Sequence, residues 1–284
     1  MSDKYVLFTQ DITMRFGGLN ALDSVTIGLK KGELLAVVGP NGAGKTTFFN
    51  VVSGIYKPTS GTVWLKGKEI TQKPPFLIAR NGMVRTFQNL GIYDNLTVIE
   101  SVCVAMHRKF LKNNLMKTLK GFLVPWDTNK PEAMTILEFI GGFKGIENEL
   151  CINLPYGFQK YLEIARSLAM GPEVLLLDEP AAGLNQSEKT EISRIIKKIV
   201  SSGVSVMLIE HDIKMVSNIS DRIVVLDYGK QIADGVPKDV ICDPKVISAY
   251  IGKPVTSAEI EAGSGGCDPV TVSVQTGQAA SADE

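Results

Sequence analysis

Short, continuously apolar runs alternate with amphipathic stretches along the first 253 residues of the chain. Four of these runs have the length of a strand and hold at most one polar residue: Leu34–Val38, Val174–Leu177, Val204–Ile209 and Ile223–Leu226. Between them, residues 158–170 and 187–201 place apolar side chains at helical spacing. Strands that are apolar on both faces and are separated by helices predict a mainly parallel sheet that helices cover on both sides.

The N-terminal part has a different pattern. A short β-rich run at Val25–Leu29 predicts a strand, and residues 62–70 alternate around Lys66-Gly67, which predicts a hairpin. Residues 44–53 predict a helix that follows the Leu34–Val38 strand. The fold class that these patterns predict is α/β, with a mainly parallel sheet, N-terminal antiparallel β elements and an inserted helical subdomain.

The inserted subdomain is expected over about residues 95–170, because residues 95–153 contain helical stretches but no strong strand. Within it, residues 108–130 form a basic patch with six basic residues against one acid, Asp127: Arg108, Lys109, Lys112, Lys117, Lys120 and Lys130. Such a patch is either a solvated helix face or a surface that touches a membrane or a partner protein.

Charge divides the chain at about residue 254. Lys plus Arg number 30 and Asp plus Glu number 30, so the whole chain is formally neutral and a nucleic-acid partner is not expected. Residues 254–284 hold five acids and no base and are rich in Gly, Ser, Ala and Thr. We therefore expect one domain over residues 1–253 and a disordered tail over 254–284, either inert or regulatory.

Other features limit the function classes. No apolar run approaches the roughly 18 residues that span a bilayer, and no signal peptide is recognisable at the N-terminus. The four cysteines form no C-x-x-C pair and only two histidines are present, so free thiols are expected rather than a zinc site or a disulfide framework.

The pattern G-x-x-x-x-G-K-[ST] occurs between the Leu34–Val38 strand and the following helix, which is the context that a phosphate-binding loop requires. Its glycines let backbone N–H groups face phosphate oxygens, and the helix N-terminus adds partial positive charge. Lys45 would reach the β- and γ-phosphates, and the Thr46 hydroxyl would bind Mg²⁺. The expected nucleotide-binding residues here are Gly39, Pro40, Asn41, Gly42, Ala43, Gly44, Lys45, Thr46 and Thr47.

Two further motifs lie where strands are expected to end. Asp178 and Glu179 follow the Val174–Leu177 run, at the sheet edge where α/β proteins bind ligands. Asp178 can hold Mg²⁺, directly or through water, and Glu179 can act as the base for an attacking water. His211 follows the Val204–Ile209 run between Glu210 and Asp212, and we expect it to join the same site.

In this order the three motifs resemble the ATP-binding-cassette ATPases, over roughly Val6 to Gly252, and the resemblance implies that the α/β core is a phosphate-loop NTPase core. The resemblance implies roles that the chemistry alone does not. Phe16 would stack on adenine, and Gln88 would sense Mg²⁺ and the attacking water and mark the groove where a membrane subunit docks. His211 would contact the γ-phosphate, and Asn185 would lie in the loop that crosses a dimer interface.

The family signature, Leu-Ser-Gly-Gly-Gln in most members, is altered here. The aligned residues are Leu154, Pro155, Tyr156, Gly157 and Phe158. Pro155 has neither a hydroxyl nor a backbone N–H to offer the γ-phosphate of the opposite subunit. Phe158 replaces a polar side chain, whereas Gly157 and the helix N-terminus remain.

Four segments look like the ATP-binding subunits of branched-chain amino-acid importers: Arg85–Gln88, Glu179–Asn185, Ile209–Asp212 and Val246–Gly252. The resemblance implies ATP hydrolysis with Mg²⁺ that powers uptake through separate permease subunits. It also implies a second ATPase subunit, in a homodimer or a heterodimer, and indirectly an extracytoplasmic solute-binding protein. The chain would then lie at the cytoplasmic face of the plasma (inner) membrane as a peripheral subunit.

Three alternatives remain at this stage. Related importers of urea or other small solutes share much of the same sequence. A soluble cassette ATPase that acts on ribosomes or DNA would usually carry two cassettes or a long coiled-coil insertion, whereas this chain has one phosphate loop. An unrelated phosphate-loop kinase would need a pocket for an acceptor substrate.

Overall fold

The structure is a computed structural model that describes residues 4–86, 95–106 and 129–251. Its centre is a six-stranded sheet with the strand order β11-β10-β4-β9-β8-β7. Strands β10, β4, β9, β8 and β7 run parallel, and β11 pairs antiparallel with β10 at one edge. The strands are β4 (Leu34–Val38), β7 (Met83–Arg85), β8 (Val174–Asp178), β9 (Ser205–Ile209), β10 (Arg222–Asp227) and β11 (Lys230–Gly235). The predicted parallel sheet is therefore confirmed.

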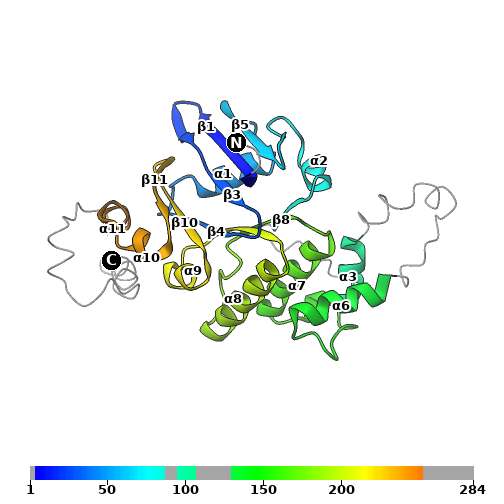
Figure 1. The fold of residues 1–284 in the computed structure, drawn as a ribbon. Helices are drawn as coiled ribbons and strands as arrows, with labels where there is room; N and C mark the ends of the chain where they lie inside the picture. The colour runs from blue at the N-terminus through cyan, green and yellow to red at the C-terminus, as the bar shows by residue number, and fades with distance from the viewer. Residues whose placement is uncertain (1–3, 87–94, 107–128, 252–284) are drawn as a thin grey trace, which may run out of the picture.

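A second, antiparallel sheet comes from the N-terminal part and lies above the first in Figure 1. Its strands are β1 (Tyr5–Phe16), β2 (Leu19–Val25), β3 (Gly28–Lys30), β5 (Ser60–Leu65) and β6 (Lys68–Glu69). The predicted hairpin is present, with Lys66 and Gly67 at φ of 50° and 71° in its turn. The single strand expected over Val25–Leu29 is wrong. Strand β2 ends at Val25 and β3 begins at Gly28. Between them, the Ile27 N–H donates to the Thr9 hydroxyl, and the Ile27 carbonyl oxygen accepts from the Thr9 hydroxyl and the Thr9 N–H.

Helices cover the parallel sheet on both faces. Helix α1 (Lys45–Val52) packs between the two sheets, and α8 (Gln186–Ser201) and α9 (Ile213–Ile219) lie on the opposite face (Figure 1). The predicted helix over 158–170 is α7 (Tyr156–Ala169), which begins two residues earlier. The other α-helices within the described ranges are α2 (Pro75–Arg80), α3 (Val98–Ala105), α6 (Lys130–Ile140), α10 (Pro237–Ile241) and α11 (Pro244–Ile251).

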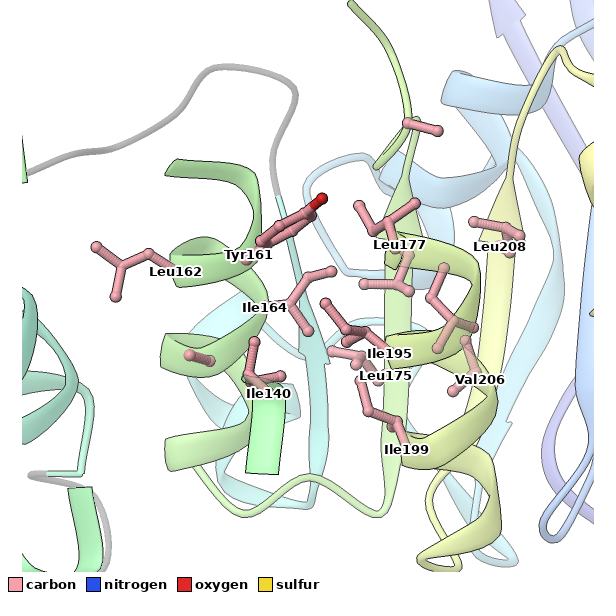
Figure 2. Packing of buried hydrophobic residues seen from close by; sticks show 14 of the residues in the cluster. Ile140, Tyr161, Leu162, Ile164, Leu175, Leu177, Ile195, Ile199, Val206 and Leu208 are labelled. Atoms are coloured by element: carbon pink, nitrogen blue, oxygen red, sulfur yellow. The ribbon is translucent and has the colours of Figure 1, made fainter. Parts of the chain in front are cut away.

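The apolar strands are apolar throughout because each faces two cores. On β4, Leu35 and Val37 point into the core shared with α1 and the antiparallel sheet, whereas Leu34 and Ala36 point toward the helices on the other face. Figure 2 shows that second core, where Leu175 and Leu177 of β8 meet Ile195 and Ile199 of α8. Burial on both faces removes the alternation that marks a half-exposed strand.

Helices α3, α6 and α7 pack against one another at the side of the sheet (Figure 1). A capping box on Thr97 starts α3, since Thr97 and Glu100 bond to each other's backbone N–H. Of the basic patch, only Lys130 lies within the described residues, at the start of α6. The tail over 254–284 lies outside them. Cys103, Cys151 and Cys242 are free thiols, and none of the helices in the described ranges is long and apolar enough to cross a membrane.

Candidate nucleotide-binding site

Parallel pairing brings the ends of four strands to one edge of the sheet. Val38 of β4 lies opposite Val225 of β10, and Ile209 of β9 lies opposite Asp178 of β8. The segments that follow these strands therefore meet at the carboxyl edge, where open α/β sheets bind ligands. Three of these segments are the sequence motifs: the phosphate loop after β4, Asp178-Glu179 at the end of β8, and His211 after β9. The fold therefore brings the three motifs to one edge of the sheet.

The phosphate loop, residues 39–46, has a conformation that requires glycine at two positions. Gly39 has φ of 152°, and a Cβ there would lie 2.1 Å from the Leu226 carbonyl oxygen. Gly44, the N-cap of α1, has φ of 98°, and a Cβ would lie 2.5 Å from the Ala21 carbonyl oxygen. Both close approaches are to backbone, which cannot rotate away. The loop is thus fixed against β2 and β10, with the N-terminal N–H groups of α1 open to an anion.

Lys45 places its ammonium inside this loop. Its Nζ donates to the carbonyl oxygens of Gly39 (2.7 Å) and Pro40 (2.9 Å), and the residue is only 5% exposed. Burial lowers the pKa of the Lys45 ammonium, and the carboxylates of Glu179 and Asp178 partly offset this effect. A phosphate in the loop would add negative charge beside the ammonium and so stabilise its charged form.

Asp178 has the surroundings of a magnesium ligand. It is 2% exposed; its Oδ2 accepts from Arg85 Nη2 at 2.7 Å, and its N–H donates to Thr86 Oγ1 at 3.2 Å. Its Oδ1 is buried with no hydrogen-bond partner in the described part of the chain. The Thr46 hydroxyl lines the nearby pocket. A carboxylate and a hydroxyl are the hard oxygen donors that Mg²⁺ takes, usually one or two from the protein beside substrate phosphates.

No group of three or more His, Cys, Asp or Glu side chains that could hold a metal occurs among residues 4–86, 95–106 and 129–251. A cage made only of protein ligands is therefore not what this region offers. Gln88, the other expected Mg²⁺ contact, lies outside the described residues.

Glu179 and His211 meet at the end of neighbouring strands. Glu179 Oε1 lies 2.6 Å from His211 Nε2, and the two side chains are 16% and 45% exposed. Glu179 has φ of 50°, a left-handed conformation that a glutamate adopts only when its surroundings hold it. Its N–H is bonded to the Ile209 carbonyl oxygen at 3.0 Å. A carboxylate held by an imidazole at hydrogen-bond distance has the geometry of an oriented general base.

Glu210 was not singled out from the sequence, yet it ties this pair to the next turn. It is 4% exposed and accepts from the backbone N–H groups of Ala181 (2.7 Å) and His211 (3.2 Å). Burial raises the pKa of the Glu210 carboxyl above its ordinary value, while those two N–H groups act in the opposite direction. Because Glu210 bonds to the segment after Glu179 and to His211, it holds the two strand ends in register.

One pocket of about 640 Å³ collects many of the predicted residues, although Gly39, Pro40 and Asp178 are not part of its lining. Phe16, the phosphate-loop residues from Asn41 to Thr46, Thr47, Glu179 and His211 line it. Phe16 is 43% exposed and its ring meets Tyr56 edge-on, with ring centres 5.5 Å apart. An aromatic face at one end and a phosphate loop at the other suit a nucleoside triphosphate.

Tyr228 also lines this pocket, and the sequence reading missed it. It is 85% exposed and stands in the turn after β10 with φ of 43°. The following Gly229 donates to the Ala43 carbonyl oxygen (3.0 Å) and accepts from the Asp23 N–H (2.8 Å), so the turn is fixed to the phosphate loop. The available signal was its position after the last parallel strand, which predicts the carboxyl edge.

The altered signature lies elsewhere, at the start of α7, and residues 154–158 do not line the pocket in the described chain. Pro155 is the N-cap of α7 and makes no side-chain capping bond. Phe158 turns inward, packing against Phe143 and Tyr161 with ring centres 5.9 Å and 5.7 Å away. Leu154 is buried, and Tyr156 is exposed.

Two contacts join this segment to the start of α8. A Cβ on Gly157 would lie 2.5 Å from Glu188 Oε1, and one on Gly183 would lie 3.0 Å from the Tyr156 ring. Asn185 is the N-cap of α8 in a capping box with Glu188. Residues 182–185, the segment expected to cross a dimer interface, therefore lie next to the signature segment, residues 154–158.

Comparison with known proteins gives the same family over most of the chain. Residues 22–182 match the family model described as ABC transporter, and residues 230–256 match the model described as branched-chain amino acid ATP-binding cassette transporter. The chain is 42% identical over 252 residues to the high-affinity branched-chain amino acid transport ATP-binding protein LivG of Salmonella typhimurium. That match covers 87% of this chain and 98% of the relative. This chain is also 42% identical to the branched-chain amino acid transport ATP-binding protein BraF of Pseudomonas aeruginosa, with the same coverage of both chains.

The fold agrees with a solved structure. The crystal structure of the ADP conformation of an ATP-binding cassette of an ABC transporter superposes with a TM-score of 0.77 at 32% identity. The superposition covers 87% of this chain and 99% of that one. The phosphate loop, Glu179 and His211 line one pocket, and Asp178 ends β8 next to Glu179. Together with these comparisons, this shows that the chain belongs to the ABC transporter family of ATP-binding cassettes.

Proposed function

We propose that this chain is the ATP-hydrolysing subunit of an importer for branched-chain amino acids. The observation that carries the proposal is the Glu179–His211 pair, 2.6 Å apart, in the lining of a pocket that phosphate-loop residues also line. The substrate class rests on the printed names of LivG and BraF and on the branched-chain model matched by residues 230–256.

The mechanism follows from the positions of the side chains. The N–H groups at the start of α1 and the Lys45 ammonium hold the phosphates, and Phe16 stacks on the adenine. Glu179 takes the proton of the attacking water, and His211 orients the Glu179 carboxylate toward that water. Asp178, Thr46 and Gln88 would hold Mg²⁺, which neutralises charge on the transferring phosphate.

The assembly belongs to the same proposal. The chain works with separate permease subunits and a second ATP-binding subunit, as a heterodimer or a homodimer, at the cytoplasmic face of the inner membrane. An extracytoplasmic solute-binding protein delivers the amino acid. Residues 1–253 form the ATPase domain, with a helical subdomain over about 95–170, and residues 254–284 are an appended tail.

Uptake assays in the source organism test the proposal. Deletion of the gene should abolish high-affinity uptake of radiolabelled leucine, isoleucine and valine. The parent gene should restore this uptake and the Lys45→Ala variant should not, because Lys45 is buried in the phosphate loop. Urea uptake serves as the matched control. If leucine uptake survives the deletion, or urea uptake falls instead, the proposed substrate class is wrong.

A further inference from the structure

The Arg85 side chain joins three elements of the fold, β7, α1 and β8. Arg85 ends β7 and is only 6% exposed as a side chain. Its Nη2 bonds to Asp178 Oδ2 at 2.7 Å, while its Nη1 bonds to Asn50 Oδ1 at 2.7 Å and to Ser53 Oγ at 2.9 Å. Asn50 lies in α1 and Ser53 is its C-cap. The guanidinium thus links the helix of the phosphate loop to the carboxylate at the end of β8.

The guanidinium also has a fixed orientation. Its central carbon lies 5.6 Å from the centre of the Phe49 ring, another side chain of α1. A lysine ammonium at this place is a single point charge, whereas the planar guanidinium offers separate donors to separate acceptors. The donors used here point to two different helix side chains and one carboxylate, so the arrangement depends on arginine.

The bond from Arg85 determines which oxygen of Asp178 remains available. Oδ2 is taken by the guanidinium, and the backbone N–H of Asp178 is taken by Thr86. Oδ1 is buried and has no hydrogen-bond partner among the described residues. A buried carboxylate oxygen without a partner is costly unless a cation or a water satisfies it.

We propose that Arg85 is a positioning residue for the magnesium ligand Asp178. It ties the Asp178 carboxylate of β8 to helix α1, so that Oδ1 faces the bound magnesium ion or its water. This inference rests on the proposed function only in that the chain binds ATP with a divalent cation.

Divalent-cation binding tests the role without relying on turnover. Mn²⁺ replaces Mg²⁺ as a spectroscopic probe, and free Mn²⁺ is measured by electron paramagnetic resonance with the purified full chain and saturating ATP. Arg85→Met should raise the apparent dissociation constant of Mn²⁺ by roughly ten- to a hundredfold, the usual effect of losing the partner that orients a metal ligand. ATP affinity in excess EDTA should stay unchanged. A Mn²⁺ constant equal to that of the parent would overturn the proposal.

Arg222→Met is the matched control. Arg222 is a partly buried arginine, 16% exposed as a side chain, and pairs with Glu33 and Asp234 at 2.8 Å each. It begins β10, at the opposite end of the strand from the pocket. Both variants should lower the melting temperature, but only Arg85→Met should change the Mn²⁺ constant. An equal change in both would show a structural effect and overturn the proposal.

A second pair of variants keeps the test decisive if Arg85→Met does not fold. Asn50→Ala removes one acceptor on α1 and leaves the Arg85–Asp178 pair, so the Mn²⁺ constant should rise above that of the parent, but by less than roughly tenfold. Arg85→Lys keeps the charge and should recover only part of the parent affinity. An unchanged Mn²⁺ constant in both would overturn the proposal. The readout involves no transported solute, so it stands even if the uptake assay assigns a different one.

Discussion

At the scale of single residues, the orientation of Glu179 is the most specific feature of the site. Its left-handed backbone, the Ile209 bond and the His211 contact together fix where the carboxylate lies. Glu179→Gln keeps the shape but loses the proton acceptor, so the ATPase rate should fall by roughly 10²–10⁴-fold. ATP binding should persist, and the variant should accumulate as an ATP-bound dimer in gel filtration.

Glu173→Gln is the control for this substitution. Glu173 is exposed and pairs with Lys66 at 2.5 Å, and it does not line the pocket. Its neutralisation should leave both rate and binding unchanged. If Glu179→Gln loses ATP affinity in parallel with rate, then Glu179 has a structural role and the base must be sought elsewhere.

Tyr228 supports a second prediction at this scale. Tyr228 and Phe16 both line the pocket, and stacking of a base on an aromatic side chain is worth about 1–3 kcal/mol. Phe16→Ala and Tyr228→Ala should therefore each weaken ATP binding, measured by calorimetry. Neither should weaken binding of inorganic triphosphate, which has no base. A loss of triphosphate affinity in Tyr228→Ala would instead mean that the turn after β10 shapes the phosphate loop.

At the scale of elements, helices α3 and α8 both begin with a capping box. Asn185 starts α8 and Thr97 starts α3, each in a capping box with a glutamate three residues later. Replacing either cap by alanine should cost about 1 kcal/mol of unfolding free energy, measured by chemical denaturation. Asn185 is also expected to lie in the loop at a dimer interface. Asn185→Ala alone should therefore reduce ATP turnover at equal stability loss, and a similar reduction in Thr97→Ala would contradict that assignment.

The elements also show how far sequence patterns reach. Strands such as β4 and β8 are predictable because burial on both faces makes every position apolar. The twelve-residue strand β1 was not predicted, because it mixes polar and apolar residues and pairs with three strands: β2, which follows it directly, and β3 and β5 further along the chain. Likewise, nothing local reveals that Phe158 packs on Phe143, fifteen residues earlier. The motifs could be recognised in the sequence because the residues of each motif are contiguous. The roles of Arg85, Glu210 and Tyr228 could not, because these residues act through contacts that only the fold creates.

At the scale of the whole molecule, the tail over 254–284 should be dispensable for ATP hydrolysis. Its composition, with five acids, no base and few large apolar residues, cannot bury enough surface to offset the entropy cost of ordering. Truncation after Lys253 should therefore leave melting temperature and turnover within error of the parent. A clear fall in either would show that the tail docks on the ATPase domain.

The altered signature predicts asymmetry when the proposed transporter contains two different ATP-binding subunits. In such a pair, the phosphate loop of this chain faces the partner's signature, while the start of α7 faces the partner's phosphate loop. Lys45, Asp178, Glu179 and His211 are all in place here, so the site on this chain's own loop should be competent. The partner's site lacks one hydroxyl, because Pro155 is the N-cap of α7 and Phe158 turns inward. A hydrogen bond of that charge-assisted kind is worth about 1.5–3 kcal/mol, or roughly ten- to a hundredfold in rate if it forms mainly in the transition state.

Glu179→Gln should therefore reduce ATPase activity of the assembled transporter more than the matching change in the partner. The structure also selects the variant that would restore symmetry. Phe158→Gln would leave a polar group against Phe143 and Tyr161 and would destabilise the helical region. Pro155→Ser alone supplies the hydroxyl at an N-cap where serine is favoured, and it leaves that packing intact. ATPase activity of the complex with Pro155→Ser should rise, and the gain should vanish when the partner's own base is also replaced. Equal losses from the two base substitutions, or no gain from Pro155→Ser, would show that the two sites hydrolyse ATP alike.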